Sequence, residues 1–216
     1  MARMLSKCLG YIYIDTGAIY RAVALCAVRE GILLEDEEAL SGLCRRIEID
    51  FRFADDDLRV FCQGEDVSSR IRGPEAGMNA STVSAHPGVR KELLTLQRKL
   101  GEEGGIVAEG RDTGTVVYPD AEIKFYLKAS PEIRGKRRLM ENTENERKYG
   151  LQKIIDMINR RDEQDRTRTV APLKIPEGAL VIDNSELDIH ETLSKILSLL
   201  EKRFPDIVIQ HKKGDI

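Results

Sequence analysis

The sequence predicts an α/β protein built on a parallel sheet, with a small antiparallel β insert. Helical patterns separate four short apolar runs, and this alternation is typical of parallel α/β folds. The runs are typical of buried strands and cover residues 11–14, 106–109, 123–127 and 180–183. Residues 49–53 and 58–62 instead alternate with period two around an acidic turn, which predicts a β-hairpin.

The expected helices follow from apolar positions at helical spacing. The chain opens inside one such pattern, which ends at Gly10. Later patterns cover residues 18–31, 35–47, 74–85, 88–100, 131–142, 151–166 and 187–204. We expect a single domain over residues 1–205 and a C-terminal tail over 206–216.

Composition excludes several classes of protein. The 216 residues carry a formal net charge of -3, contain no Trp, and are 5% aromatic. Nucleic-acid surfaces are usually basic and carry stacking aromatics, so we expect no nucleic-acid partner. No apolar run approaches the roughly 18 residues of a membrane span, and no secretory signal is present, so we expect a cytoplasmic protein without a membrane partner. No CxxC pair supplies zinc-ligand spacing, and the three histidines are scattered, so no metal ligands are assigned.

Polar clusters follow the four predicted strands. They are DTG at 15–17, GRD at 110–112, KAS at 128–130 and DNS at 183–185. Ligands of open parallel sheets bind at the carboxyl ends of the strands, so chemistry is expected at these clusters.

Arginine and aspartate dominate the candidate site residues. Arg111 and Asp112 place a fork of donors beside a carboxylate, although a structural ion pair would explain them too. Thr16 and Arg21 could bind a ligand or simply cap and flank a helix. Ser81 and Arg90 are further candidates, although each taken singly is typical of an ordinary surface or cap residue. The last candidates are Arg161, Asp165 and Arg168, and a salt-bridged helix face explains them as well as a ligand site does.

Taken together, these arginines indicate a phosphate ligand. Several guanidinium groups near strand ends repel one another unless an anion lies between them. A phosphate monoester is mostly dianionic at neutral pH and can itself be the nucleophile, so no activated Ser, Cys or His is required. Such chemistry depends on orientation and on charge neutralisation by Arg and Mg²⁺. Phosphoryl transfer between nucleotides fits this pattern.

Four segments resemble bacterial cytidylate (CMP) kinases, which are P-loop nucleoside monophosphate kinases. They are DTGAIYRAVAL, GEDVSSRIR, EGRDTGTVVYPDA and RRDEQDRTRTVAPL, and the resemblance spans about residues 2–205. It implies a three-layer parallel sheet, an acceptor-binding lobe at about 21–100 with its β insert at 48–67, and a lid at about 134–160. It also implies a monomer that transfers phosphate from ATP, with Mg²⁺, to CMP or dCMP.

The resemblance assigns roles to individual residues. Ser81, Arg90 and Asp112 would read cytosine, and Arg161 and Asp165 would hold the ribose. Thr16, Arg21, Arg111 and Arg168 would bind phosphate, while Arg134, Arg137 and Arg138 would belong to the lid. The group expected to act in catalysis comprises Arg111, Asp112, Arg137 and Arg161.

The sequence departs from this family in one respect. No G-x-x-x-x-G-K-[ST] motif occurs in it, although that loop holds the donor phosphates in P-loop enzymes. We expect that about twenty residues are absent, including the central first strand of a sheet ordered 2-3-1-4-5, and that the chain as given is inactive. The alternatives are a non-catalytic pyrimidine-nucleotide or RNA-binding module, and a kinase for UMP.

Overall fold

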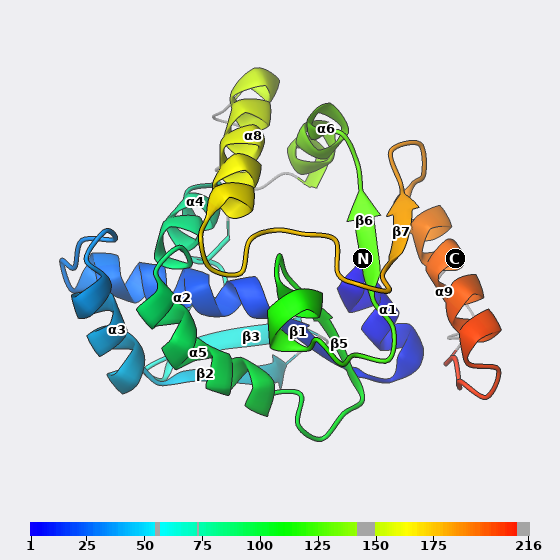
Figure 1. Cartoon of the computed structure of the whole chain (residues 1–216), viewed down its shortest axis with the longest axis horizontal. Helices are drawn as coiled ribbons and strands as arrows, with labels where there is room; N and C mark the ends of the chain where they lie inside the picture. Colours follow the sequence, from blue (N-terminus) through cyan, green and yellow to red (C-terminus); the bar gives the residue numbers. More distant parts are fainter. Residues whose placement is uncertain (55–56, 73, 142–149, 211–216) are drawn as a thin grey trace.

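The computed structural model describes residues 1–54, 57–72, 74–141 and 150–210. Within these ranges the predicted alternation of strands and helices is present (Figure 1). The four predicted parallel strands are confirmed, and the third begins two residues later than predicted. They are β1 (Ile12–Asp15), β5 (Ile106–Glu109), β6 (Phe125–Lys128) and β7 (Leu180–Asp183).

The predicted helices are also present, with ends shifted by a few residues. Gly10 closes the first helix in the left-handed conformation, at φ 67°, and Asp188 opens the last through a capping box with Glu191. The helices are α1 (Ala2–Leu9), α2 (Thr16–Arg29), α3 (Glu37–Arg46), α4 (Pro74–Val83), α5 (Pro87–Lys99), α6 (Pro131–Glu141), α8 (Leu151–Thr167) and α9 (Ile189–Arg203).

The parallel strands form two pairs. Strand β1 pairs with β5, and strand β6 pairs with β7, both in parallel. The register sets Asp15 opposite Glu109 and Lys128 opposite Asp183, so the polar clusters of paired strands meet at the same edge. Among the described residues, β5 and β6 have no other strand partner.

A shared core joins the two strand pairs. Apolar side chains of α1 and α9 pack with Val107 of β5, Phe125 of β6 and Ile182 of β7. A second core lies beneath α2, α3, α4 and α5 and includes the fully buried Ile19 and Leu93. Helices α1 and α2 both contact β5, so the strands lie between helices as an α/β fold requires.

The predicted hairpin is confirmed and lies against α2. Strands β2 (Ile49–Ala54) and β3 (Asp57–Cys62) pair in antiparallel fashion, and a short β4 (Glu65–Asp66) extends the sheet. The acidic turn at 55–56 falls outside the described residues. So do residues 142–149 of the expected lid and residues 211–216 of the tail.

Two features near the site and the tail were not predicted. A π-helical turn, η1 (Thr113–Val117), follows Asp112. In this turn the backbone amide of Val116 donates to the carbonyl oxygen of Asp112 at 2.8 Å. The tail residues Ile207 and Ile209 pack onto the core of α1 and α9. In the described part of the chain, no helix is both long and apolar enough to cross a membrane.

Candidate functional site

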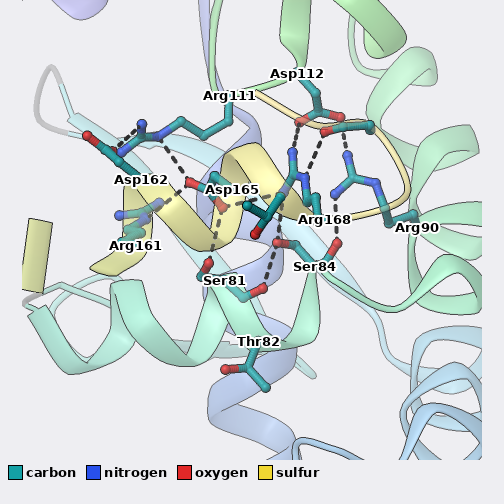
Figure 2. Close-up of polar contacts among 12 residues, drawn as sticks. Ser81, Thr82, Ser84, Arg90, Arg111, Asp112, Arg161, Asp162, Asp165 and Arg168 are labelled. Atoms are coloured by element: carbon teal, nitrogen blue, oxygen red, sulfur yellow. Dashed lines mark hydrogen bonds and ion pairs between the residues drawn. The ribbon is translucent and has the colours of Figure 1, made fainter. Parts of the chain in front are cut away.

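Asp112 lies buried between two arginines at the end of β5 (Figure 2). Arg90 donates a hydrogen bond to its carboxylate, and Nη2 of Arg168 lies 3.7 Å from its other oxygen. Arg90 also donates to the carbonyl of Ser84 at 2.9 Å and stacks 5.5 Å from the ring centre of Tyr20. The carboxylate is therefore held between two arginines from separate segments of the sequence, one of which is itself fixed by Ser84 and Tyr20.

Asp165, on α8, occupies the centre of the cluster. Ser81 of α4 donates to one of its carboxylate oxygens at 3.1 Å, and Nη1 of Arg168 lies 3.5 Å from the same oxygen. Its other oxygen is buried and has no hydrogen-bond partner in the part of the chain that the structure describes. It lies 3.5 Å from Nε of Arg111 and 3.8 Å from Nε of Arg161. Two groups predicted to bind different parts of a ligand, Ser81 and Asp165, are thus in direct contact.

Arg161 carries a positive charge in crowded surroundings. Burial, together with the positive charge of Arg111, lowers its pKa to about 10, while Asp165 opposes the shift. Its buried Nε finds no hydrogen-bond partner within the described ranges. Burial and the charge of Arg90 likewise lower the pKa of Arg168, whose buried Nη2 also has no hydrogen bond to the described part of the chain. An anion bound between Arg161 and Arg168 would stabilise the positive charge of both.

Arg21 and Thr16 stand at the end of β1. Arg21 donates to the carboxylate of Asp15 at 2.7 Å, and the same carboxylate caps α2 by accepting from the amide of Ala18. The hydroxyl of Thr16 donates to the carbonyl of Glu109 at 2.8 Å. The Thr16 hydroxyl therefore links the first residue of α2 to the end of β5, a structural bond that the predicted phosphate role did not include.

Gly110 permits this close approach of the two strand ends. A Cβ atom at Gly110 would lie 2.1 Å from Oγ1 of Thr16 and 2.4 Å from Oγ1 of Thr113. No side chain larger than hydrogen fits there without moving one of these residues.

The predicted lid arginines have different partners. Arg134 donates to Asp162 of α8 at 2.6 Å. Arg137 donates instead to the carbonyls of Asn184 and Leu187, beyond the end of β7. Arg138 faces the same small pocket as Arg134 and Arg137.

One cavity of about 2070 Å³ connects these groups. It reaches from the strand ends to α4 and α8 and is also lined by β5 and β6. Its lining includes the predicted substrate-binding residues, namely Thr16, Arg21, Ser81, Arg90, Arg111, Asp112, Arg161, Asp165 and Arg168. Residues from five segments of the sequence are thus brought to one place.

Comparison with known proteins identifies the family. The family model for cytidylate kinase matches residues 1–202. A cytidylate kinase of Citrifermentans bemidjiense is 46% identical over 214 residues, which cover 99% of this chain and 90% of the relative. A cytidylate kinase of Bacillus subtilis is 42% identical over 203 residues, which cover 94% and 91% of the two chains.

The chain belongs to the cytidylate kinase family.

Members of the cytidylate kinase family are nucleotide phosphotransferases, so the interpretation of the arginine clusters as a site for phosphoryl chemistry is confirmed at that level. The residue-by-residue roles stay predictions. Within the described ranges, no group of three or more His, Cys, Asp and Glu side chains is placed to hold a metal ion.

Sequence reasoning missed two residues that the structure places in the cluster. The carbonyl oxygen of Ser84 accepts a hydrogen bond from Arg90, and its hydroxyl oxygen accepts one from Nη1 of Arg168 at 3.2 Å. Asp162 accepts from both Arg111 and Arg134. Asp162 directly follows Arg161 and precedes Asp165 by three residues, a spacing that puts both carboxylates near one face of the helix. That spacing in the sequence already indicated that Asp162 lies close to Asp165.

Proposed function

We propose that this chain carries the acceptor side of an ATP-dependent phosphoryl transfer that converts CMP or dCMP to the diphosphate. The main support for the proposal is a set of four buried polar atoms that line one cavity and find no hydrogen-bond partner among the described residues. They are Nε of Arg21, Nε of Arg161, Oδ2 of Asp165 and Nη2 of Arg168. Each unsatisfied buried group costs about 1–3 kcal/mol, so the site favours a ligand with several acceptors and some donors. A nucleoside monophosphate has both.

Asp112 and Arg90 would select cytosine. A carboxylate can accept from the exocyclic N4 amine of cytosine, whereas uracil presents a carbonyl oxygen at that position. Because Asp112 is buried and paired with Arg90 and Arg168, a uracil oxygen would face its carboxylate oxygens without a hydrogen to share. This arrangement favours CMP over the alternative acceptor UMP.

Arg161 and Asp165 are proposed to hold the ribose, with Asp165 accepting from a sugar hydroxyl. Arg21 and Arg111 are proposed to hold the phosphate, with Arg168 near its base-proximal side. Arg168 lies 3.7 Å from Asp112 and 3.5 Å from Asp165, so its contribution is shared with the base site. The acceptor phosphate oxygen would then attack the donor without a general base.

Mg²⁺ is proposed to enter with ATP. The carboxylates at the ends of β1 and β5 are Asp15 and Glu109, which lie opposite each other in the β1–β5 register. Asp15 is engaged with Arg21, and Glu109 accepts from Tyr13. Mg²⁺ usually needs only one or two carboxylates when substrate phosphates complete its coordination, so this edge can serve a metal–nucleotide complex.

The donor side is proposed to require one more parallel strand, carrying the phosphate-binding loop, between β5 and β6. Three observations support this proposal. The 216 residues contain no G-x-x-x-x-G-K-[ST] motif, β5 and β6 line the same cavity, and one apolar core joins their two strand pairs. Paired on both edges, such a strand would give the order β1, β5, added strand, β6, β7. We propose that the chain as given is inactive for this reason and that the complete enzyme is a monomer.

Two assays test the proposal. Calorimetric titration should detect CMP binding by the 216-residue chain without ATP, and much weaker binding of UMP. ADP release should be undetectable with this chain but present in a version extended by an apolar strand and a G-x-x-x-x-G-K-S loop. Full turnover by the 216-residue chain would contradict the donor-side proposal. Tight binding of CMP together with no turnover in the extended version would favour a non-catalytic nucleotide-binding module.

A further inference from the structure

Asp162 joins two arginines that come from opposite sides of the cluster. Its side chain is 7% exposed, and it lies on α8. Oδ1 accepts from Nη1 of Arg111 at 2.8 Å, and Oδ2 accepts from Nη2 of Arg134 at 2.6 Å. Figure 2 shows the contact with Arg111, which reaches Asp162 from the end of β5. Each carboxylate oxygen is therefore used by a different arginine.

The two arginines need a negative charge between them. Two guanidinium groups that share one small site repel each other, and the side chains of Arg111 and Arg134 are partly shielded from solvent, at 31% and 29% exposed. Burial alone would raise the pKa of Asp162, but the hydrogen bond from Arg134 and the charge of Arg111 outweigh it, so its pKa lies below the usual value. Asp162 is thus ionised and offsets this repulsion.

The same contact connects the start of α6 to the acceptor site. Arg134 is fixed at a second point by its Nε, which donates to the carbonyl of Ala129 at 3.2 Å. Helix α6 packs along α8, and Asp162 lies on the side of α8 that Arg134 reaches. Asp162 therefore ties β5, α6 and α8 together at one carboxylate.

The arginines, rather than Asp162, face the adjacent small pocket. This pocket has a volume of about 260 Å³ and is lined by Arg111, Arg134, Arg137, Arg138 and Arg161 together with Met78, Met157 and Ile158. Asp162 lines the large cavity but not this pocket. It therefore supports two of the five cations without occupying the space that they enclose.

We propose that Asp162 is a positioning residue, which holds the Arg111 guanidinium in the orientation that binds the acceptor phosphate and couples it to Arg134 at the root of α6. The inference rests on the proposed function, because it assumes that the phosphate of a bound nucleotide meets Arg111. Asp162 acts through the two arginines and makes no contact with the ligand itself.

The test separates the phosphate from the rest of the nucleotide. The dissociation constants of CMP and cytidine are measured by calorimetry on the 216-residue chain, and their ratio reports the phosphate contribution. We expect Asp162→Asn to weaken CMP binding about tenfold while leaving cytidine binding unchanged. The matched control is Asp156→Asn, which changes an exposed carboxylate of the same helix; Asp156 accepts from Gln152 at 3.0 Å. It should leave both constants unchanged.

A second variant guards against misfolding of the first. The double variant Arg134→Gln with Asp162→Asn removes one charge of each sign, so the remaining Arg111 has no neighbouring cation at Arg134 to repel it. We expect it to weaken CMP binding about threefold, between the wild type and the single variant. A wild-type phosphate contribution in the double variant would contradict the proposal even if the single variant does not fold.

The remaining outcomes are distinguishable. Failure of the wild-type chain to bind CMP would remove the proposed function itself. Binding of CMP by the wild type, with equal or tighter binding by Asp162→Asn, would show that the carboxylate competes with the phosphate and would overturn this inference alone. Equal weakening of CMP and cytidine would indicate general support of the fold and would also overturn it.

Discussion

Replacing Asp112 by asparagine tests how the site distinguishes cytosine from uracil. The substitution keeps the size of the side chain but replaces a carboxylate oxygen by an NH₂ group. That group can donate to the uracil carbonyl and cannot accept from the cytosine amine. The preference for CMP should therefore fall, and UMP binding should improve relative to it.

The structure sets the size of both effects. A well-formed polar contact to a base edge discriminates by about 1–3 kcal/mol, so the ratio of the UMP and CMP dissociation constants should fall by a factor of roughly 5 to 150. Asp112 also pairs with Arg90 and Arg168, and the side chains of all three are less than 10% exposed, at 8%, 7% and 5%. Loss of a hydrogen bond to a charged partner costs about 1.5–3 kcal/mol, so the free energy of unfolding should drop by a similar amount.

The assay is calorimetric titration of CMP and UMP, with urea unfolding of each variant to establish that it is folded. Asp156→Asn serves again as the control, since it changes the same chemical group at an exposed position on α8. A folded Asp112→Asn variant with an unchanged UMP-to-CMP ratio would refute the assignment of Asp112 to the base. Equal weakening of both nucleotides would refute it as well.

Three further predictions concern the glycine and the charges around the cavity. Gly110→Ala should lower the free energy of unfolding in urea by about 1–3 kcal/mol, because its Cβ would lie 2.1 Å from Thr16 Oγ1, whereas Gly150→Ala, with open space around it, should not. Arg161→Met should raise the melting temperature, since it removes a buried cation whose pKa is lowered to about 10. The same variant should show no detectable CMP binding, and an unchanged affinity for CMP would contradict the assignment of Arg161 to the ribose. The pKa of Asp162 is lowered in the folded state, so its stabilising contribution is present above the unfolded-state pKa of about 3.9 and is lost as the pH falls through the folded-state value. In an acid titration followed by circular dichroism, the stability of Asp162→Asn should therefore depend less steeply on pH below about pH 4 than that of the wild type.

The sequence predicted the elements because their local patterns are strong. The apolar runs that became β1 and β5 end in DTG and GRD, and parallel pairing brings those ends together whatever the loops between them do. The hairpin followed from its period-two alternation. The π-helical turn after Asp112 could not be predicted, since its bonds depend on where the Asp112 carbonyl points once β5 and α5 are packed.

The partners of the charged residues were less predictable than their presence. The clustering of arginines followed from the positions of Arg111 and Arg161 near strand ends and on a helix face. That Arg137 would turn to the carbonyls after β7, and Arg134 to Asp162, depends on how α6 packs on α8. Arg134 and Arg137 lie three residues apart on α6, so tertiary packing alone gives these two arginines different partners.

A crystal structure of this chain bound to CMP would show whether the arginines converge on one nucleotide. We expect electron density for CMP in the large cavity, with the cytosine amine against Asp112 and the phosphate between Arg21 and Arg111. Density for CMP at any other place, or a cytosine ring that faces away from Asp112, would contradict it.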